Sequence, residues 1–516
     1  MNDEKISANL LAFLVDNIRK YNFLWLSLFI GGIFRLINLT GVTYKDYDEG
    51  VYLYSAVLIM KGSVPYRDFF FNHLPLSEYL LALFFNVFGV GLLQARILTF
   101  FLSEMTIVII YFLGKDLYGK LGGNISALLF AIEGSAIATS RIFFLEPFMT
   151  FFSSLTVFFF LRGIRNDDKR LIFISGIFLS FSTFSKITGV LLLVAIVAFS
   201  VFRQKFQKEF FIAFLCSVFL MCTPFLVICG NEFLIQPLLF QAYRTSSSGT
   251  LISNLKVLAF NSALTIFMGS IALGLSIIQR LIKNRPDSWQ FKFDEGDLFI
   301  ILWALILVTF FTTYKVFFYH YFYQAVPAFC FLIYKLVRRI NFIQKVNSRI
   351  FLLIFILLNG IQLTLVVERN ILPVDDTYLH VAQFIESTSQ PHEKILTANP
   401  LLAFLSHREN VGNLTNPTGT LESENVKHDL EGKNFLEILE YLLIESRNIS
   451  MVEKRLERPA QEKIARYLQE EDLKYVIIED IARQYFSDFL IDEIHKVSQL
   501  IRIFDEANIE VYEVIH

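Results

Sequence analysis

Long apolar runs fill the first 370 residues of this chain and constrain its fold more than any other feature. A bilayer with a hydrocarbon core of about 30 Å is crossed by a helix of about 20 apolar residues. Measured with that length, the sequence contains eleven candidate spans: 22–39, 96–113, 121–139, 145–161, 171–185, 187–202, 210–229, 257–278, 298–313, 322–337 and 350–367. The sequence therefore predicts a polytopic α-helical membrane protein, and a water-soluble enzyme is excluded.

The charges divide the chain into two unlike parts. Residues 1–370 contain 32 Lys and Arg against 21 Asp and Glu, whereas residues 371–516 contain 14 against 27. We expect a transmembrane domain in the first part and a soluble extracytoplasmic domain in the second. Because the acidic second part has no basic stripe to neutralise phosphates, nucleic acid is not expected as a partner.

Segments of the acidic part alternate between helix-like and strand-like patterns, which indicates a small α/β domain. The helix-like stretches are 376–388, 435–447, 452–470 and 483–503. The strand-like runs are 394–397, 475–478 and 509–515. No glycine-rich phosphate loop and no Ser/His/Asp grouping occurs there, so the sequence assigns this domain no catalytic role.

Basic residues predict the orientation, because Lys and Arg concentrate in short cytoplasmic connections. The basic clusters are Arg19 and Lys20; Lys115 and Lys120; Arg162, Arg165, Lys169 and Arg170; Arg203, Lys205 and Lys208; Arg280, Lys283, Arg285 and Lys292; and Arg338, Arg339, Lys345 and Arg349. The helices are expected in a plasma or inner membrane, with the N-terminus in the cytoplasm. We expect residues 40–95 to form one long external loop, in which the apolar segment 75–89 lies at the membrane surface because it is short and contains Glu78.

Ionisable residues collect at the expected external face, where each is a functional candidate because charge is costly at a membrane. They are Arg35, Asp46, Asp48, Glu49, Asp68, His73, Glu78, Arg96, Arg141, Glu146, Lys186, Arg244, Lys315 and His320. Some of the cations could simply extend to the interface. Asp48 and Glu49 are harder to explain by packing, since two carboxylates follow a span directly. Cations and carboxylates together suit an anionic lipid substrate and a group that loses a proton.

Several short motifs occur in order on this face. They are Tyr47–Tyr54, Pro65–Phe69, Asn72–Leu76, Phe88–Gly89 and Ala95–Arg96, then Ser140–Pro147, Phe184–Gly189 and His320–Pro327. Together they resemble the GT-C glycosyltransferases, in the branch of protein O-mannosyltransferases and bacterial aminoarabinose transferases (glycosyltransferase family 39 type). The similarity covers about the first 370 residues, and the predicted topology agrees with it.

The resemblance implies transfer of a sugar, with inversion, from a polyprenyl-phosphate donor to a glycan, lipid or protein acceptor. It implies Asp48 as the base, with Glu49 orienting it or binding the sugar. Glu146 would hold an acceptor or sugar hydroxyl. The residues expected to bind the substrate or its phosphate are His73, Arg96, Arg141, Lys186, Arg244 and His320.

The sequence departs from the family pattern at two positions. The acid of the second loop is commonly aspartate but is Glu146 here, and the lysine before the paired prolines of aminoarabinose transferases is replaced at Asn72–Pro75. Transfer of that particular sugar is therefore not implied. A divalent metal is possible but unassigned, since the carboxylates and His73 show no diagnostic ligand spacing.

Two alternatives from other classes stay open. A polytopic transporter or lipid flippase would also carry many helices and external charges, although transporters often show inverted repeats, and none is found in this sequence. A GT-C-like chain without catalysis could act as a scaffold.

Overall fold

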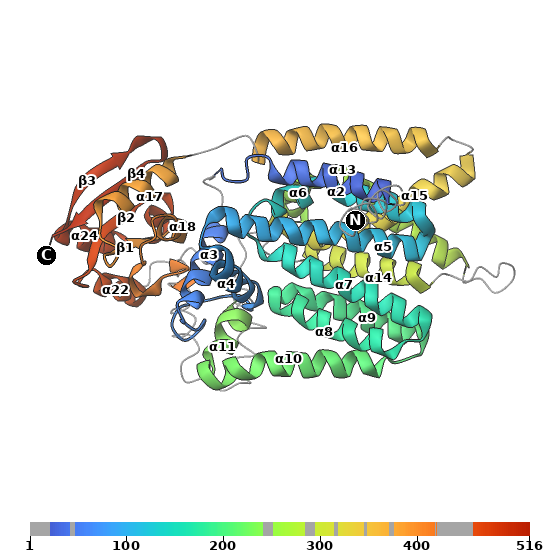
Figure 1. Cartoon of the computed structure of the whole chain (residues 1–516), viewed down its shortest axis with the longest axis horizontal. Coiled ribbons are helices and arrows are strands. Elements are labelled where there is room, and N and C mark those ends of the chain that lie inside the picture. Colours follow the sequence, from blue (N-terminus) through green and yellow to red (C-terminus); the bar gives the residue numbers. More distant parts are fainter. Residues whose placement is uncertain are drawn as a thin grey trace, which may run out of the picture.

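The computed structural model describes residues 21–41, 47–240, 251–283, 295–313, 318–344, 348–370, 376–417, 419–420 and 458–515. Their helices form a bundle with a small sheet region at one end (Figure 1). The bundle helices are α2 (Asn22–Leu36), α5 (Leu92–Ala131), α6 (Gly134–Ser140), α7 (Leu145–Asn166), α8 (Lys169–Ser185), α9 (Leu191–Arg203), α10 (Lys208–Cys229), α13 (Leu251–Lys283), α14 (Glu295–Thr313), α15 (Val326–Gln344) and α16 (Ser348–Asn370).

Each of the eleven predicted spans overlaps a helix, although the span 22–39 runs past the end of α2 at Leu36. By length and composition, four helices among the described residues could cross a membrane, namely α5, α7, α10 and the α14 segment 295–312. Shorter apolar helices include α2, the stretch 187–203 and the stretch 262–278. Two predicted spans, 96–113 and 121–139, begin in the single helix α5, which kinks at Gly119, where φ is +80°. Glycine suits that position, since other residues rarely adopt positive φ.

The predicted span 121–139 is broken. Helix α5 ends at Ala131, and the short helix α6 begins at Gly134. Glu133 lies between them and caps α6, because its carboxylate accepts a hydrogen bond from the Ala136 amide at 2.7 Å. An acidic cap inside an apolar run thus ends one helix and starts another.

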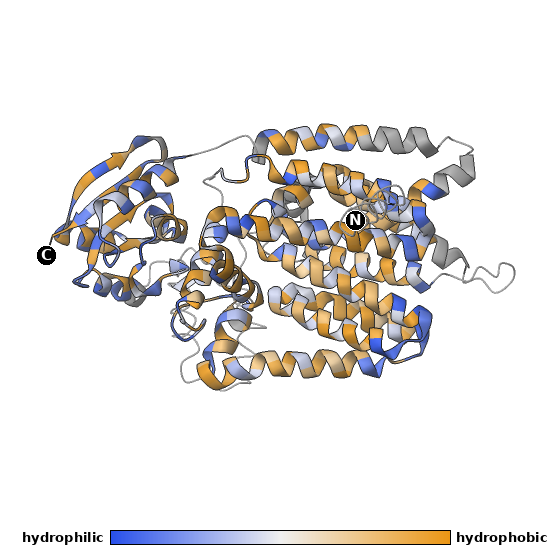
Figure 2. Cartoon of the chain, in the orientation of Figure 1, coloured by the Kyte–Doolittle hydropathy of each residue, from blue (hydrophilic) through white to orange (hydrophobic). Residues whose placement is uncertain are grey.

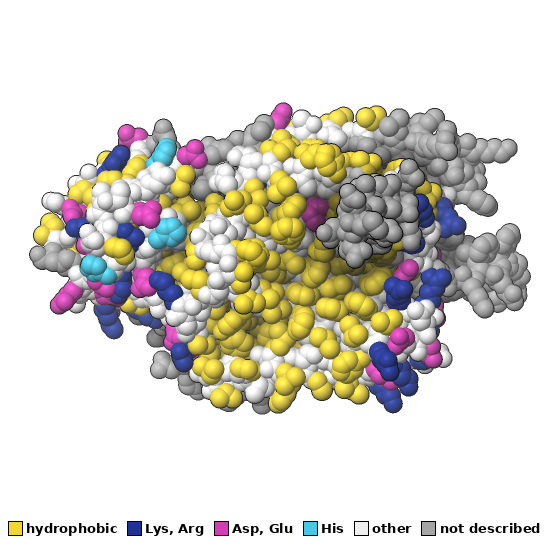
Figure 3. Space-filling model, in the orientation of Figure 1, with side chains coloured by type: hydrophobic (Ala, Val, Ile, Leu, Met, Phe, Trp, Pro, Cys, Tyr) yellow, Lys and Arg dark blue, Asp and Glu magenta, His cyan; other side chains and the backbone are white. Residues whose placement is uncertain are grey.

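Hydrophobic side chains cover the middle of the bundle. Figure 3 shows a broad apolar band, with Lys and Arg gathered at the end away from the sheet region. Figure 2 shows the same contrast, with hydrophobic helices and hydrophilic connections at that end. A wide apolar surface between polar ends is what a bilayer requires.

The residues from 376 onward form a four-stranded sheet with helices packed on it. The strands are β1 (Lys394–Thr397), β2 (Leu473–Ile478), β3 (Ser498–Phe504) and β4 (Ile509–Val514), in the order β1-β2-β4-β3. Strand β2 is parallel to β1 and antiparallel to β4. The helices are α17 (Thr377–Thr388), α18 (Pro400–Leu405), α22 (Arg458–Tyr467), α23 (Asp480–Tyr485) and α24 (Asp488–Val497).

Several expectations for this region are confirmed. The helix-like stretch 376–388 is α17, and all three strand-like runs are strands. The helical stretch expected at 483–503 is wrong in part, because its end forms β3, which pairs antiparallel with β4. Ile501 and Ile503 are β-branched and suit a strand. The stretch 435–447 lies outside the described residues.

Two helices absent from the eleven spans lie between the bundle and the sheet region: α3 (Tyr47–Met60) and α4 (Leu76–Phe88) (Figure 1). Helix α4 corresponds to the expected surface segment 75–89. Helix α3 packs against α18 so closely that a Cβ on Gly50 would lie 2.5 Å from the Leu401 nitrogen. The Asn410 amide also donates a hydrogen bond to the Tyr54 hydroxyl at 2.8 Å. The sheet region is therefore docked firmly on α3.

Candidate active site

A cavity of about 340 Å³ lies where α3 meets the sheet region. The helical part of the chain contributes most of its lining: Tyr47, Asp48, Val51, Tyr52, Asn72, His73, Phe144, Lys186, Phe318, His320 and Tyr321. The sheet region contributes Asn416, Ile481, Gln484 and Tyr485. Four of the residues selected from the sequence thus share one cavity: Asp48, His73, Lys186 and His320.

Asp48 lies in the first turn of α3 and is half-buried. Its carboxylate makes no hydrogen bond or ion pair within the described parts of the chain, and the helix N-terminus favours a negative charge at this position. A carboxylate in a cavity that is not held by a cation can accept a proton from a bound hydroxyl.

Glu49, the next residue, is held very differently. It is fully buried, and Arg96 binds both of its carboxylate oxygens, with distances of 2.8 and 2.6 Å. The Phe143 amide donates a third hydrogen bond at 2.8 Å. Arg96 also donates to the carbonyls of Leu39 and Gly41. Neither Glu49 nor Arg96 is among the described residues that line the cavity, and their pairing fixes α3 against α5.

Lys186 lies between α8 and the 3₁₀ helix η1 (Ile187–Val190), and is 5% exposed. It forms an ion pair with Glu146, a residue in the first turn of α7. Its ammonium also lies over the Tyr321 ring, 4.2 Å from the centroid. An ammonium has three donors, so Lys186 can keep Glu146 and still donate to a ligand in the cavity.

His320 belongs to the 3₁₀ helix η3 (Tyr319–Gln324), which precedes α15. Its Nε2 lies 3.7 Å from the Glu146 carboxylate. Burial, reinforced by the Lys186 charge, lowers the pKa of His320 to about 3, although Asp48 acts in the opposite direction. The ring is therefore neutral near pH 7, and its contact with Glu146 is not an ion pair there. His320 can serve as a neutral hydrogen-bonding group rather than as a cation.

His73 approaches the cavity from the loop between α3 and α4. Its Nε2 lies 3.3 Å from the Tyr52 hydroxyl, and the Tyr66 hydroxyl donates to its carbonyl oxygen at 2.6 Å. Burial raises the pKa of Tyr52 well above its usual range, so this hydroxyl stays protonated. Tyr52 and His73 both present polar groups to the cavity.

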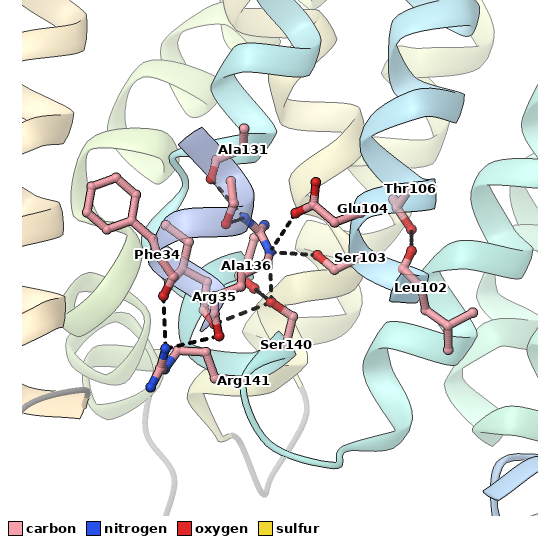
Figure 4. Close-up of polar contacts among 12 residues, drawn as sticks. Phe34, Arg35, Leu102, Ser103, Glu104, Thr106, Ala131, Ala136, Ser140 and Arg141 are labelled. Carbon is pink, nitrogen blue, oxygen red and sulfur yellow. Dashed lines mark hydrogen bonds and ion pairs between the residues drawn. The ribbon is translucent and has the colours of Figure 1, made fainter. Parts of the chain in front are cut away.

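Two other arginines lie away from the described cavity lining and join helices (Figure 4). Arg35 is fully buried and donates hydrogen bonds to Ser103, Ser140 and two backbone carbonyls. Arg141 donates to the carbonyls of Phe34, Arg35 and Asn38, which end α2. Arg141, selected from the sequence as a phosphate ligand, therefore caps a helix here.

Comparisons with known proteins agree with this architecture. The family model described as dolichyl-phosphate-mannose-protein mannosyltransferase matches residues 72–228. The solved structure of ArnT from Cupriavidus metallidurans bound to undecaprenyl phosphate is similar over 96% of this chain and 97% of that chain, with a TM-score of 0.62 and 11% identity. The chain has the GT-C glycosyltransferase fold. The GT-C fold that the sequence motifs implied is confirmed.

A second GT-C structure extends the likeness. The apo form of the Archaeoglobus fulgidus oligosaccharyltransferase is similar over 94% of this chain and 73% of that chain, with a TM-score of 0.59 and 13% identity. No curated protein sequence matches the chain. At these identities the solved structures establish the fold.

Three residues selected from the sequence as functional candidates lie outside the described residues: Asp46, Arg244 and Lys315. Within the described ranges, no three His, Cys, Asp or Glu side chains gather as metal ligands. Glu49 and Glu146, two carboxylates considered as ligands, are instead paired with Arg96 and Lys186.

Sequence reasoning missed the cavity residues of the sheet region. Asn416, Gln484 and Tyr485 follow no motif, and they reach the cavity only because α18 docks on α3. The Tyr47 hydroxyl donates to Asn416 Oδ1 at 3.1 Å, which joins the residue before Asp48 to this region. In this GT-C chain, one wall of the cavity thus comes from the part to which the sequence assigned no role.

A buried acid at the start of α23 gives a prediction for pH dependence. Glu479 is fully buried, accepts a hydrogen bond from the Ala482 amide at 2.9 Å, and has a second oxygen without a partner in the described chain. Burial raises its pKa to about 7. An unfolded glutamate loses its proton near pH 4.5, so between these values the folded state binds more protons. The contribution of Glu479 to the free energy of unfolding is fully present below about pH 4.5 and is lost as the pH rises through 7.

We expect Glu479→Gln to remove this loss, because glutamine is uncharged and keeps an oxygen for Ala482. The gain at pH 8 is up to about 3 kcal/mol from a shift of this size. Thermal unfolding of the full chain at pH 5 and pH 8 measures it. The exposed Glu471→Gln is the control. Equal pH dependence in wild type and Glu479→Gln would show that this carboxyl is not the cause.

Proposed function

We propose that this chain transfers a sugar from a polyprenyl-phosphate donor to an acceptor hydroxyl, with inversion at the anomeric carbon. One observation carries the proposal: Asp48, not held by a cation among the described residues, and Lys186, a buried ammonium, line the same cavity. A base can take the proton that the acceptor hydroxyl loses. A cation in the same cavity can stabilise the negative charge that grows on the lipid phosphate. The undecaprenyl phosphate in the similar ArnT structure supports a donor of this lipid class.

Asp48 takes the proton of the acceptor hydroxyl as its oxygen attacks the anomeric carbon. The bond between that carbon and the phosphate oxygen breaks, and its electron pair remains on the lipid phosphate. Lys186 stabilises the growing negative charge by a charge-assisted hydrogen bond. A phosphate leaving group needs no proton from a general acid. A single displacement of this kind inverts the anomeric configuration.

The remaining candidates support these two residues. Glu146 positions the Lys186 ammonium. The Glu49–Arg96 pair holds the start of α3, and so places Asp48. His73 and the neutral His320 supply hydrogen-bonding groups for sugar hydroxyls or phosphate oxygens. If a divalent metal takes part, the carboxylate of Asp48 offers it an oxygen ligand.

We further propose that residues 1–370 form the membrane transferase domain and residues 371–516 an extracytoplasmic α/β domain. The gathering of Lys and Arg at the bundle end away from the sheet region supports a cytoplasmic location for that end. The reaction then takes place on the extracytoplasmic face, next to the sheet region. The acceptor is a glycan, a lipid or a protein.

The test is release of polyprenyl phosphate from donor lipid by the purified full-length protein in detergent. A panel of radiolabelled undecaprenyl-phosphate sugars and envelope extracts serves as donors and acceptors. We expect label to leave the donor and to appear in a product only when the protein is present. A transporter, a flippase or a non-catalytic scaffold would leave the donor intact, and that result would overturn the proposal.

A further inference from the structure

The cavity has one wall that carries no charge. The described residues that the sheet region contributes are Asn416, Ile481, Gln484 and Tyr485, which are all neutral. The ionisable groups Asp48, His73, Lys186 and His320 all come from the helical part. The two sides of the cavity therefore differ in the chemistry that they can recognise.

This neutral wall is joined by a hydrogen bond to the residue that precedes Asp48. Tyr47, the residue before Asp48, donates its hydroxyl hydrogen bond to Asn416. Lys186 is held by Glu146 and by the Tyr321 ring, both from the helical part. A hydroxyl that gives its proton to Asp48 thus has the sheet region as its neighbour, whereas the phosphate has the helical part.

Hydrogen bonds within the sheet region hold this wall. Helix α23 is capped at its start by Glu479, and the Tyr485 carbonyl accepts a hydrogen bond from Gln461 of α22 at 3.0 Å. Gln484 is exposed and Tyr485 is half-buried, so both are accessible to a molecule that enters from outside. A wall with accessible polar groups is suited to binding a ligand selectively.

We propose that Gln484 and Tyr485 of α23 bind the acceptor, and that the acceptor group is a neutral saccharide. This inference rests on the proposed function. The amide of Gln484 offers both a donor and an acceptor, as a sugar hydroxyl requires. The Tyr485 ring offers a flat apolar surface for the C–H face of a pyranose, and its hydroxyl offers a further polar contact.

A charged acceptor does not suit the same wall. A phosphorylated group would lie against neutral side chains, because the lysine of the cavity is on the donor side and already holds Glu146. Leaving an anion without a partner in a partly buried site is costly. The cavity of about 340 Å³ has room for one or two sugar rings.

The experiment separates acceptor binding from donor binding. Full-length wild type, Gln484→Ala and Tyr485→Phe are assayed for transfer from the undecaprenyl-phosphate sugars to three acceptors: neutral methyl glycosides, their phosphorylated counterparts and a Ser/Thr peptide. Binding of undecaprenyl phosphate is measured separately. Gln499→Ala, an exposed glutamine on β3 outside the described cavity lining, is the matched control.

We expect neutral glycosides to be the preferred acceptors. Each α23 variant should raise the acceptor KM by about tenfold or more, because a lost hydrogen bond to a substrate hydroxyl leaves a polar group unpaired. Affinity for undecaprenyl phosphate should change less than about twofold. Unchanged acceptor KM in both variants, or a preference for the phosphorylated or peptide acceptors, would overturn the inference. Donor left intact by wild type with every acceptor would instead overturn the proposed function.

Discussion

Replacing Asp48 by asparagine should lower the turnover of sugar transfer by about 10²–10⁴-fold, the usual contribution of a positioned base. Asparagine is nearly the same size but cannot take a proton. The half-buried side chain makes no ion pair with the described residues, so its loss should leave the fold intact. The measurement is kcat for transfer from labelled undecaprenyl-phosphate sugar, together with the affinity for undecaprenyl phosphate.

The control is Asp68→Asn, in the loop between α3 and α4. The Asp68 carboxylate binds Arg67 and the Val64 amide and is not among the described cavity residues. This variant should retain turnover close to that of wild type. If Asp48→Asn keeps wild-type turnover, the base is another group. If it loses donor affinity as much as turnover, Asp48 acts in binding.

Replacing Lys186 by methionine has the second large expected effect. The charge-assisted hydrogen bond from Lys186 to the donor phosphate should be worth about 1.5–3 kcal/mol, so the Kd for undecaprenyl phosphate should rise about 10- to 100-fold. The variant should also lose about 3–5 kcal/mol of stability, because Glu146 is left as a buried charge without its partner. Binding and thermal unfolding of the same preparation measure both effects.

A double variant separates these two roles. Lys186→Met combined with Glu146→Gln removes both charges, so most of the lost stability should return while donor affinity stays low. The matched surface pair, Lys61 with Glu409, is about half exposed, and Lys61→Met should cost about 1 kcal/mol or less. Recovery of donor affinity in the double variant would show that Lys186 does not bind the phosphate.

Much of the fold could be predicted because hydrophobic periodicity and length act locally. The apolar runs 145–161 and 210–229 lie within α7 and α10. The run 121–139 is not one continuous helix because its break depends on a cap: Glu133 ends one helix and begins the next, bonded to Ser262 from the distant α13. Hydropathy alone contains no information on such a contact.

The candidate site could be predicted in part, for a similar reason. Asp48 and Lys186 stand out because charge near an apolar run is costly, and both line the cavity. The same argument selected Arg96 and Arg141, whose partners are Glu49 and backbone carbonyls. Charge at a membrane face indicates that a partner exists, but it does not distinguish a substrate from a neighbouring helix.

The wall from the sheet region could not be predicted at all. Gln484 and Tyr485 reach the cavity through tertiary docking of the sheet region on α3, which includes the close approach of Gly50 to Leu401. No local pattern in the sequence encodes that contact.

The most direct test of the central claim is an experimental structure of the protein with undecaprenyl phosphate bound. We predict that the phosphate lies in the cavity, with one oxygen within hydrogen-bond distance of Lys186 Nζ and the Asp48 carboxylate on the side toward α23. A phosphate bound outside this cavity, with Lys186 still held only by Glu146 and Tyr321, would contradict the account.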